Sequence, residues 1–116
     1  MPAVTRELDL SKLSELEALL GTERTAIVRT LVTELTAALA RIDEGLAGGD
    51  LTEVAAAAHA ARNSALMIDA QPLLTVLKQL ETCARSDEPQ AASAARTRLA
   101  AVWPPLRSKL ELAAGP

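Results

Sequence analysis

Apolar residues recur at steps of three and four along almost the whole chain. The clearest series is Ile27, Leu31, Leu35, Leu39, Ile42 and Leu46. This spacing places side chains on one face of a helix, and no stretch alternates at period two for long enough to predict a strand. The chain has 116 residues, one tryptophan and no phenylalanine or tyrosine. Its core must therefore be packed from Leu, Ala, Val and Ile, which predicts an all-α fold.

Capping residues and breakers divide this pattern into segments. A first helix is expected to begin near Asp9 or Ser11 and to stop at Gly21, and a second, longer helix should run from a Thr22 cap to the glycine pair at Gly48. A third should begin at an Asp50 N-cap and end near residue 67, followed by a fourth that starts around Pro72 and ends near residue 85.

The C-terminal segment contains two consecutive prolines. Asp87 is expected to cap a fifth helix, and Pro104 and Pro105 should kink or break it because each lacks a backbone donor, with residues 106–112 resuming as a short helix. The prediction is a single domain over residues 1–116. Its architecture is an antiparallel four-helix bundle with an additional N-terminal helix and a proline-interrupted C-terminal helix.

Charge and cysteine content exclude several classes of function. The net charge of −3 and the pI near 5.1 argue against a surface made for nucleic acid or anionic lipid. Cys83 is the only cysteine, so no intrachain disulfide and no structural zinc site can be assembled. The sequence has no apolar signal core and no run long enough for a membrane span, so we expect a cytoplasmic protein without membrane contact.

The only histidine, His59, lies on the third predicted helix, nearly opposite its apolar stripe. Its own face carries Ala55, Ala56, Arg62 and Asn63 one turn away, and Thr52 and Leu66 a turn further. These side chains are mostly small, so a partner could approach the imidazole closely. We expect Ala55, Ala56 and Leu66 to belong to a docking surface.

The fourth helix should run back antiparallel after a turn centred near Ala70. His59 and Glu81 are each eleven residues from that centre and should therefore lie at one level. The Glu81 carboxylate could accept the Nδ1–H of His59, which would leave Nε2 with a free lone pair as a nucleophile. The alternative is that Glu81 simply pairs with Arg85 at i+4.

The spacing of residues after His59 is itself a motif. The residues at plus three, five, six, ten, twenty-one and twenty-two are Arg62, Ser64, Ala65, Asp69, Leu80 and Glu81. With no gap needed, this order resembles the signature of histidine-containing phosphotransfer (HPt) domains. The Gly-Gly-Asp-Leu that precedes the histidine helix also resembles the family, and the resemblance covers about residues 8–85.

This resemblance implies a phosphorelay intermediate rather than an independent catalyst. His59 would accept a phosphoryl group from the aspartyl phosphate of a response-regulator receiver domain, in some systems within a hybrid histidine kinase, and pass it to another receiver. Arg62 would pair with the phosphoryl group, and the family places a Glu or Gln at the position of Glu81. The receiver supplies the acidic pocket, a lysine and Mg²⁺, so this chain would need no cofactor or metal of its own.

Three positions depart from the family pattern. Asn63 stands where the family usually has glycine, Asp69 replaces the usual turn glycine, and Ala61 replaces a leucine. A side chain at Asn63 narrows the approach to His59, although its amide could also hydrogen-bond a phosphate. Two alternatives therefore remain open: a degenerate HPt-like bundle that binds a receiver or another signalling protein without transfer, and an unrelated helical scaffold with an incidental histidine.

Overall fold

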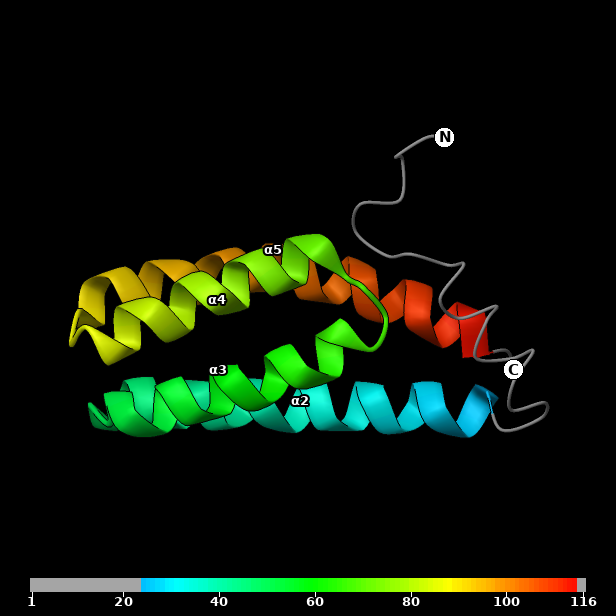
Figure 1. The fold of residues 1–116 in the computed structure, drawn as a ribbon, viewed down its shortest axis with the longest axis horizontal. Coiled ribbons are helices and arrows are strands. Elements are labelled where there is room, and N and C mark those ends of the chain that lie inside the picture. Colours follow the sequence, from blue (N-terminus) through cyan, green and yellow to red (C-terminus); the bar gives the residue numbers. More distant parts are fainter. Residues whose placement is uncertain (1–23, 115–116) are drawn as a thin grey trace.

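The computed structural model describes residues 24–114, and this part of the chain consists of four helices (Figure 1). They are α2 (Arg24–Gly48), α3 (Leu51–Leu66), α4 (Gln71–Arg85) and α5 (Pro89–Ala114). The all-α prediction and the approximate ends of the second, third and fourth predicted helices are confirmed. The helix predicted between Asp9 and Gly21 lies outside the described residues and stays a prediction.

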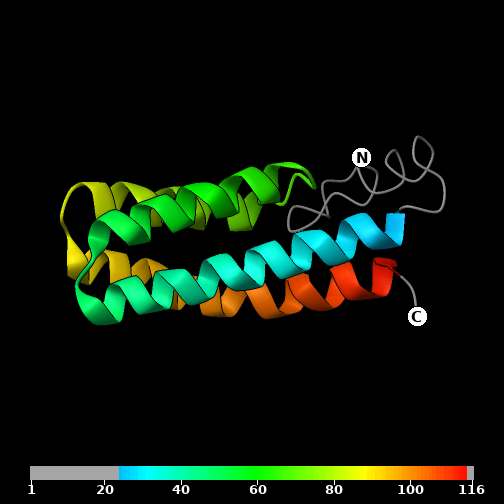
Figure 2. The same cartoon turned by 90° about the horizontal axis from the view of Figure 1, so that it is seen from below.

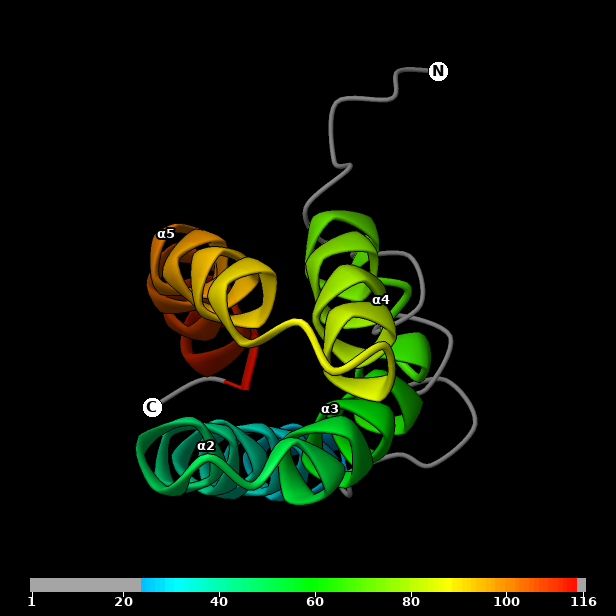
Figure 3. The same ribbon diagram turned by 90° about the vertical axis from the view of Figure 1, so that its left-hand side faces the viewer.

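The four helices occupy the corners of a square when the bundle is seen end-on (Figure 3). Around the square, α2 packs against α3, α3 against α4, α4 against α5, and α5 returns to α2. Helices α2 and α5 extend together beyond the shorter hairpin of α3 and α4 (Figure 2). Where they end, the Thr25 hydroxyl donates to the Ala114 carbonyl at 2.7 Å. The predicted antiparallel bundle is confirmed.

The core is aliphatic and closely packed. Its largest fully buried side chains are Leu31, Leu35, Ile42, Ile68, Leu73, Leu77, Leu80, Leu99, Leu106 and Leu110. Helix α3 contributes mainly alanines, including Ala57, Ala58, Ala61 and Ala65. Near its start it passes close to α2, since a Cβ on Gly45 would come within 2.7 Å of Val54 Cγ2. Small residues thus allow α3 to lie near its neighbours, which fixes the position of its outer face.

Helix α3 begins as the sequence predicts. Asp50 is its N-cap, and the side chain accepts a hydrogen bond from the Glu53 backbone N–H at 3.1 Å. The end of α3 uses a left-handed residue, Asp69, with φ of +52°. The N–H of Ala70 then reaches the Ala65 carbonyl at 3.3 Å, which closes a Schellman motif.

The prediction that Asp87 caps α5 is wrong. Asp87 has φ of +58° and occupies the left-handed position after α4, where its N–H donates to Ala84 and the Glu88 N–H donates to Cys83. These two bonds make a second Schellman motif. Helix α5 begins only at Pro89, and the Glu88 carbonyl accepts its first backbone bond. Asp87 therefore ends one helix rather than starting the next.

The break that the sequence allows at Pro104 and Pro105 does not occur, because α5 continues from Pro89 through both prolines to its end, and the short helix expected over residues 106–112 is part of α5. The two prolines are exposed and leave two backbone bonds unmade, to the carbonyls of residues 100 and 101, which also lie on the exposed side where water can satisfy them. Trp103 and Leu106, on either side, are both buried. Their packing holds the two halves of α5 on one continuous helix.

Candidate functional site

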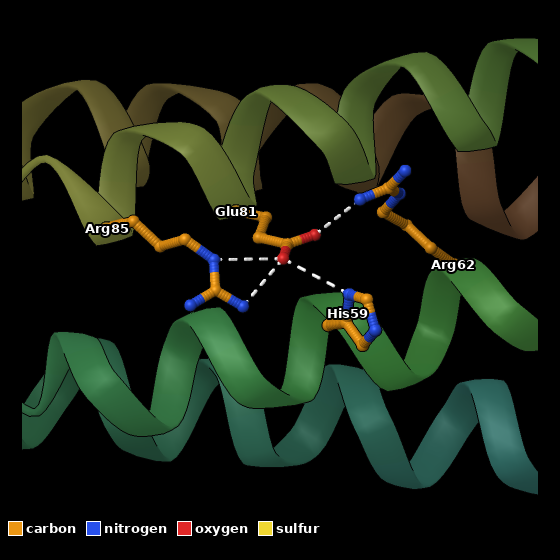
Figure 4. Close-up of polar contacts among 4 residues, drawn as sticks. All are labelled: His59, Arg62, Glu81 and Arg85. Atoms are coloured by element: carbon orange, nitrogen blue, oxygen red, sulfur yellow. Dashed lines mark hydrogen bonds and ion pairs between the residues drawn. The ribbon is translucent and has the colours of Figure 1, made fainter.

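The predicted site residues come from facing sides of α3 and α4. His59 and Arg62 extend from α3, whereas Glu81 and Arg85 extend from α4. The other three side chains converge on the Glu81 carboxylate (Figure 4). Glu81 is almost fully buried, with 7% of the residue exposed. It belongs to the last part of an amphipathic helix whose apolar stripe faces the core, so its backbone position is set by packing rather than by its own contacts.

The carboxylate of Glu81 has partners on both of its oxygens. His59 Nδ1 lies 3.2 Å from Oε2, and Arg62 Nη1 donates to Oε1 at 2.7 Å. Arg85 donates to Oε2 through Nε at 3.0 Å and through Nη2 at 2.8 Å. The predicted proximity of His59 and Glu81 is confirmed. The i+4 pair with Arg85, which the sequence offered as an alternative, forms at the same time.

The environment of Glu81 favours its charged form. Burial opposes ionisation and by itself raises the pKa of the carboxyl group. Hydrogen bonds from Arg62 and then Arg85, together with the charges of His59 and Arg62, outweigh burial and hold the pKa of Glu81 below its usual range. A buried carboxylate without such partners would be strongly destabilising. The site therefore contains a fixed negative charge next to the imidazole.

His59 combines one restrained edge with an open one. Its side chain is 56% exposed, although Nδ1 faces the buried Glu81. The other ring nitrogen, Nε2, points away from the carboxylate (Figure 4). When Nδ1 carries the proton it donates to Oε2, and Nε2 then has a lone pair directed away from the carboxylate. The arrangement can present a neutral nucleophile to a molecule that approaches from solvent.

The outer face of α3 forms an exposed surface around the histidine. Its members, which we call the α3 stripe, are Thr52, Ala56, His59, Ala60, Asn63 and Leu66. Leu66 is 56% exposed, as a docking role requires. Ala56 is exposed as well, so both of these predicted docking residues are at the surface, although their role stays a prediction.

Ala55, the third predicted docking residue, is not on this surface. Only 3% of it is exposed, and it lines a hollow beside α4 together with Ala84 and Arg85. It is therefore a packing residue of the interface between α3 and α4. The same side of α3 carries Arg62, which is why that arginine reaches Glu81.

Asn63 lies on the opposite side of the α3 stripe from Glu81. It is exposed and lines a shallow hollow between α2 and α3 together with Ala60 and Ser64. In that hollow the Ser64 hydroxyl donates to Glu34 Oε1 at 3.1 Å. Asn63 thus does not separate His59 from its carboxylate, but it stays one turn from the imidazole on the same exposed surface.

Two further findings concern residues 24–114 as a whole. They contain no group of three or more His, Cys, Asp or Glu side chains arranged to hold a metal ion. No helix among them is both long enough and apolar enough to cross a membrane.

Comparisons with known proteins support the fold. The family model described as Hpt domain matches residues 26–111. A crystal structure of histidine-containing phosphotransfer protein B (HptB) from Pseudomonas aeruginosa PAO1 is similar in fold, with a TM-score of 0.88 and 23% sequence identity. That alignment covers 97% of this chain and 96% of the other. A comparison with curated protein sequences found no match.

Proposed function

This chain belongs to the Hpt domain family, and from that premise we propose that His59 accepts a phosphoryl group from one receiver domain and donates it to another. Family membership supports the broader role of a phosphotransfer intermediate in two-component signalling. The proposal adds three points to this role: which residue is phosphorylated, which partners exchange the phosphoryl group, and what the neighbouring side chains do. The donor is either a separate response-regulator receiver or a receiver within a hybrid histidine kinase.

One observation carries the proposal: the buried Glu81 carboxylate lies 3.2 Å from Nδ1 of a histidine whose side chain is 56% exposed. A carboxylate at this position favours the Nδ1–H tautomer, so that the nucleophilic lone pair is on Nε2. Nε2 is also the nitrogen that points away from the Glu81 carboxylate (Figure 4).

The transfer step balances with these groups. The Nε2 lone pair forms a bond to phosphorus while the phosphorus–oxygen bond of the aspartyl phosphate breaks, and the electron pair of that bond returns to the aspartate as a carboxylate. The ring keeps its Nδ1 proton and becomes a phosphoimidazolium cation. Glu81 stabilises this cation, because its charge is already in place and needs no rearrangement. Transfer to a second aspartate reverses the same changes.

We infer that Arg62 neutralises charge on the transferred group. Its contact with Glu81 uses one of the five N–H donors of the guanidinium, and 31% of the side chain is exposed. We assign it to the phosphoryl oxygens once phosphorus is bonded to Nε2. Mg²⁺ and the acidic pocket that holds it belong to the receiver in this proposal, and catalysis by this chain rests on positioning and charge.

The decisive experiment is incubation with a panel of phosphorylated receiver domains and Mg²⁺. The protein should acquire a phosphoramidate that is labile in acid and persistent in base. His59→Gln should abolish this modification and leave the helical circular dichroism unchanged. Phosphate that persists in the His59→Gln variant, or that is found on Ser or Thr, would refute the assignment.

Asn63 supports a second candidate function, a receiver-binding adaptor that transfers no phosphate. The family usually has glycine at this position, and here an exposed amide side chain lies one turn from His59 on the α3 stripe. An adaptor would bind a receiver, yet neither the parent protein nor an Asn63→Gly variant would become phosphorylated. That pair of results would replace the relay with the adaptor.

A further inference from the structure

The two oxygens of the Glu81 carboxylate are unequally occupied. Within residues 24–114, Oε1 accepts from Arg62 alone, at 2.7 Å. Oε2 is approached by three nitrogens, because Arg85 donates through both Nε and Nη2, at 3.0 and 2.8 Å, and His59 Nδ1 lies at 3.2 Å. A carboxylate oxygen has two lone-pair directions. The histidine contact is the longest of the four, as expected if Arg85 already occupies those directions.

We propose that Arg85 is a positioning residue that competes with His59 for Oε2 of Glu81, and that its withdrawal strengthens the hydrogen bond that orients the imidazole. This inference rests on the proposed function of His59. It assigns Arg85 a role that its i+4 spacing does not indicate, because an ordinary i+4 ion pair would leave the neighbouring helix unaffected.

Arg85 is able to leave the carboxylate. It belongs to the last turn of α4, and 59% of its side chain is exposed, against 31% for Arg62. Solvent reaches more than half of the Arg85 side chain, so an acidic group on a docked partner could compete with Glu81 for the guanidinium and draw it away. Glu81 would then keep Arg62 on Oε1 and offer Oε2 to His59. Docking would thereby favour the tautomer with a nucleophilic Nε2.

The inference is tested on the ring itself, in the absence of any receiver. Nitrogen-15 NMR of protein labelled at histidine, recorded at a pH where the imidazole is neutral, measures the ratio of the Nδ1–H to the Nε2–H tautomer. Arg85→Ala should raise this ratio by a factor between about two and five, the upper value being what one whole hydrogen bond of ordinary net strength produces. An unchanged or lower ratio would overturn the inference, and so would a parent ring already entirely in the Nδ1–H form.

Two variants separate competition for one oxygen from a simple loss of positive charge. Arg107→Ala removes another exposed arginine in an i+4 pair, with Glu111 on α5, and should leave the ratio unchanged. Arg62→Ala removes a less exposed charge from the other oxygen and should change the ratio less than Arg85→Ala. Equal effects of Arg62→Ala and Arg85→Ala would show that charge alone acts, and the competition would be rejected.

These measurements are independent of the relay itself. If the protein shows the tautomer shift but accepts no phosphate from any receiver, the Arg85 competition would stand and the proposed function would be rejected. If the protein is phosphorylated on His59 but shows no tautomer shift, the proposed function would stand and the Arg85 competition would be rejected. Circular dichroism of each variant identifies any that fail to fold. If Arg85→Ala fails to fold, Arg85→Lys replaces it, because lysine keeps the charge but has no two-nitrogen fork. A smaller rise in the tautomer ratio is then expected.

Discussion

His59 Nδ1 lies 3.2 Å from Oε2 of Glu81, a residue twenty-two positions further along the chain and on the neighbouring helix. The contact exists because the turn between α3 and α4 brings residues at equal distances from its centre to one level. It places an ionised, nearly buried carboxylate beside an exposed imidazole.

Arg62→Ala should slow phosphotransfer to His59 or shorten the lifetime of the phosphohistidine by about tenfold, since one charge-assisted contact to the phosphoryl group is lost. Rapid-quench measurement with a phosphorylated receiver determines both quantities. Arg98→Ala is the control, because Arg98 is an exposed arginine on α5 whose hydrogen bond goes to Gln79. Equal rates for the parent and Arg62→Ala would remove Arg62 from the site.

Asn63→Gly distinguishes two roles of the amide. If Asn63 obstructs the approach to His59, the variant should transfer phosphate faster, although glycine inside a helix costs about 1 kcal/mol relative to alanine. If the amide donates to the phosphoryl group, transfer should become slower at unchanged receiver affinity. Transfer rates and receiver binding measured on the same samples give the sign, and Asn63→Ala controls for the loss of helix stability. No change in rate would mean that Asn63 has neither role.

Stability should fall in acid partly because of Glu81. Its pKa is lowered in the folded protein, so the carboxylate stabilises the fold above the unfolded value of about 4.3, and this contribution disappears as the pH falls through the lower, folded value. Urea unfolding across that range should show a steeper loss for the parent than for Glu81→Gln. At neutral pH the variant should be less stable by about 1–3 kcal/mol.

Glu53 provides the comparison for this pH experiment. Its pKa is also lowered, chiefly by a hydrogen bond from Arg41, but the pair is at the surface, where solvent screens it. Glu53→Gln should therefore change the pH dependence of stability less than Glu81→Gln does. A larger effect at Glu53 would contradict the view that the buried carboxylate dominates acid unfolding.

Asp87→Gly should stabilise the protein by about 1 kcal/mol. Asp87 has φ of +58°, a conformation that glycine adopts without the steric cost of a Cβ. Thermal or urea unfolding measures the gain. Asp87→Ala is the matched control and should bring no gain, because alanine has the same Cβ and no polar side chain. Equal stability of the two variants would show that backbone conformation does not limit this turn.

The sequence predicts much of the fold because local patterns and packing agree over α2, α3 and α4. It fails at Asp87 because aspartate suits both the start of a helix and a left-handed helix end, and the choice depends on where α5 begins to bury side chains. It also allows a break at Pro104 and Pro105 that does not occur, for a related reason. The burial of Trp103 and Leu106 outweighs the two missing backbone bonds. The helix propensity of the local sequence does not include this burial.

The candidate site, like the fold, is predicted only in part from the sequence. Counting outward from Ala70 predicts that His59 and Glu81 meet, because that contact follows from the hairpin alone. The prediction that Ala55 lies on the exposed docking surface is wrong, because spacing along α3 does not reveal on which side α4 lies. The sequence also treats the Arg85 pair as an alternative to the histidine contact. Both form because one carboxylate has enough acceptor positions for several donors, which only the geometry of the assembled helices reveals.

The alanine-rich interior of α3 has a further consequence. Alanine has no side-chain rotamers to lose, so the helix can approach its neighbours closely without any entropic cost from that source. His59 lies near the middle of this helix, where backbone bonds on both sides hold its Cα. The backbone that carries the imidazole is therefore rigid before any encounter. A donor and an acceptor would meet a histidine at the same position, so differences in speed between partners should arise from the partners, including how far each draws Arg85 away from Glu81.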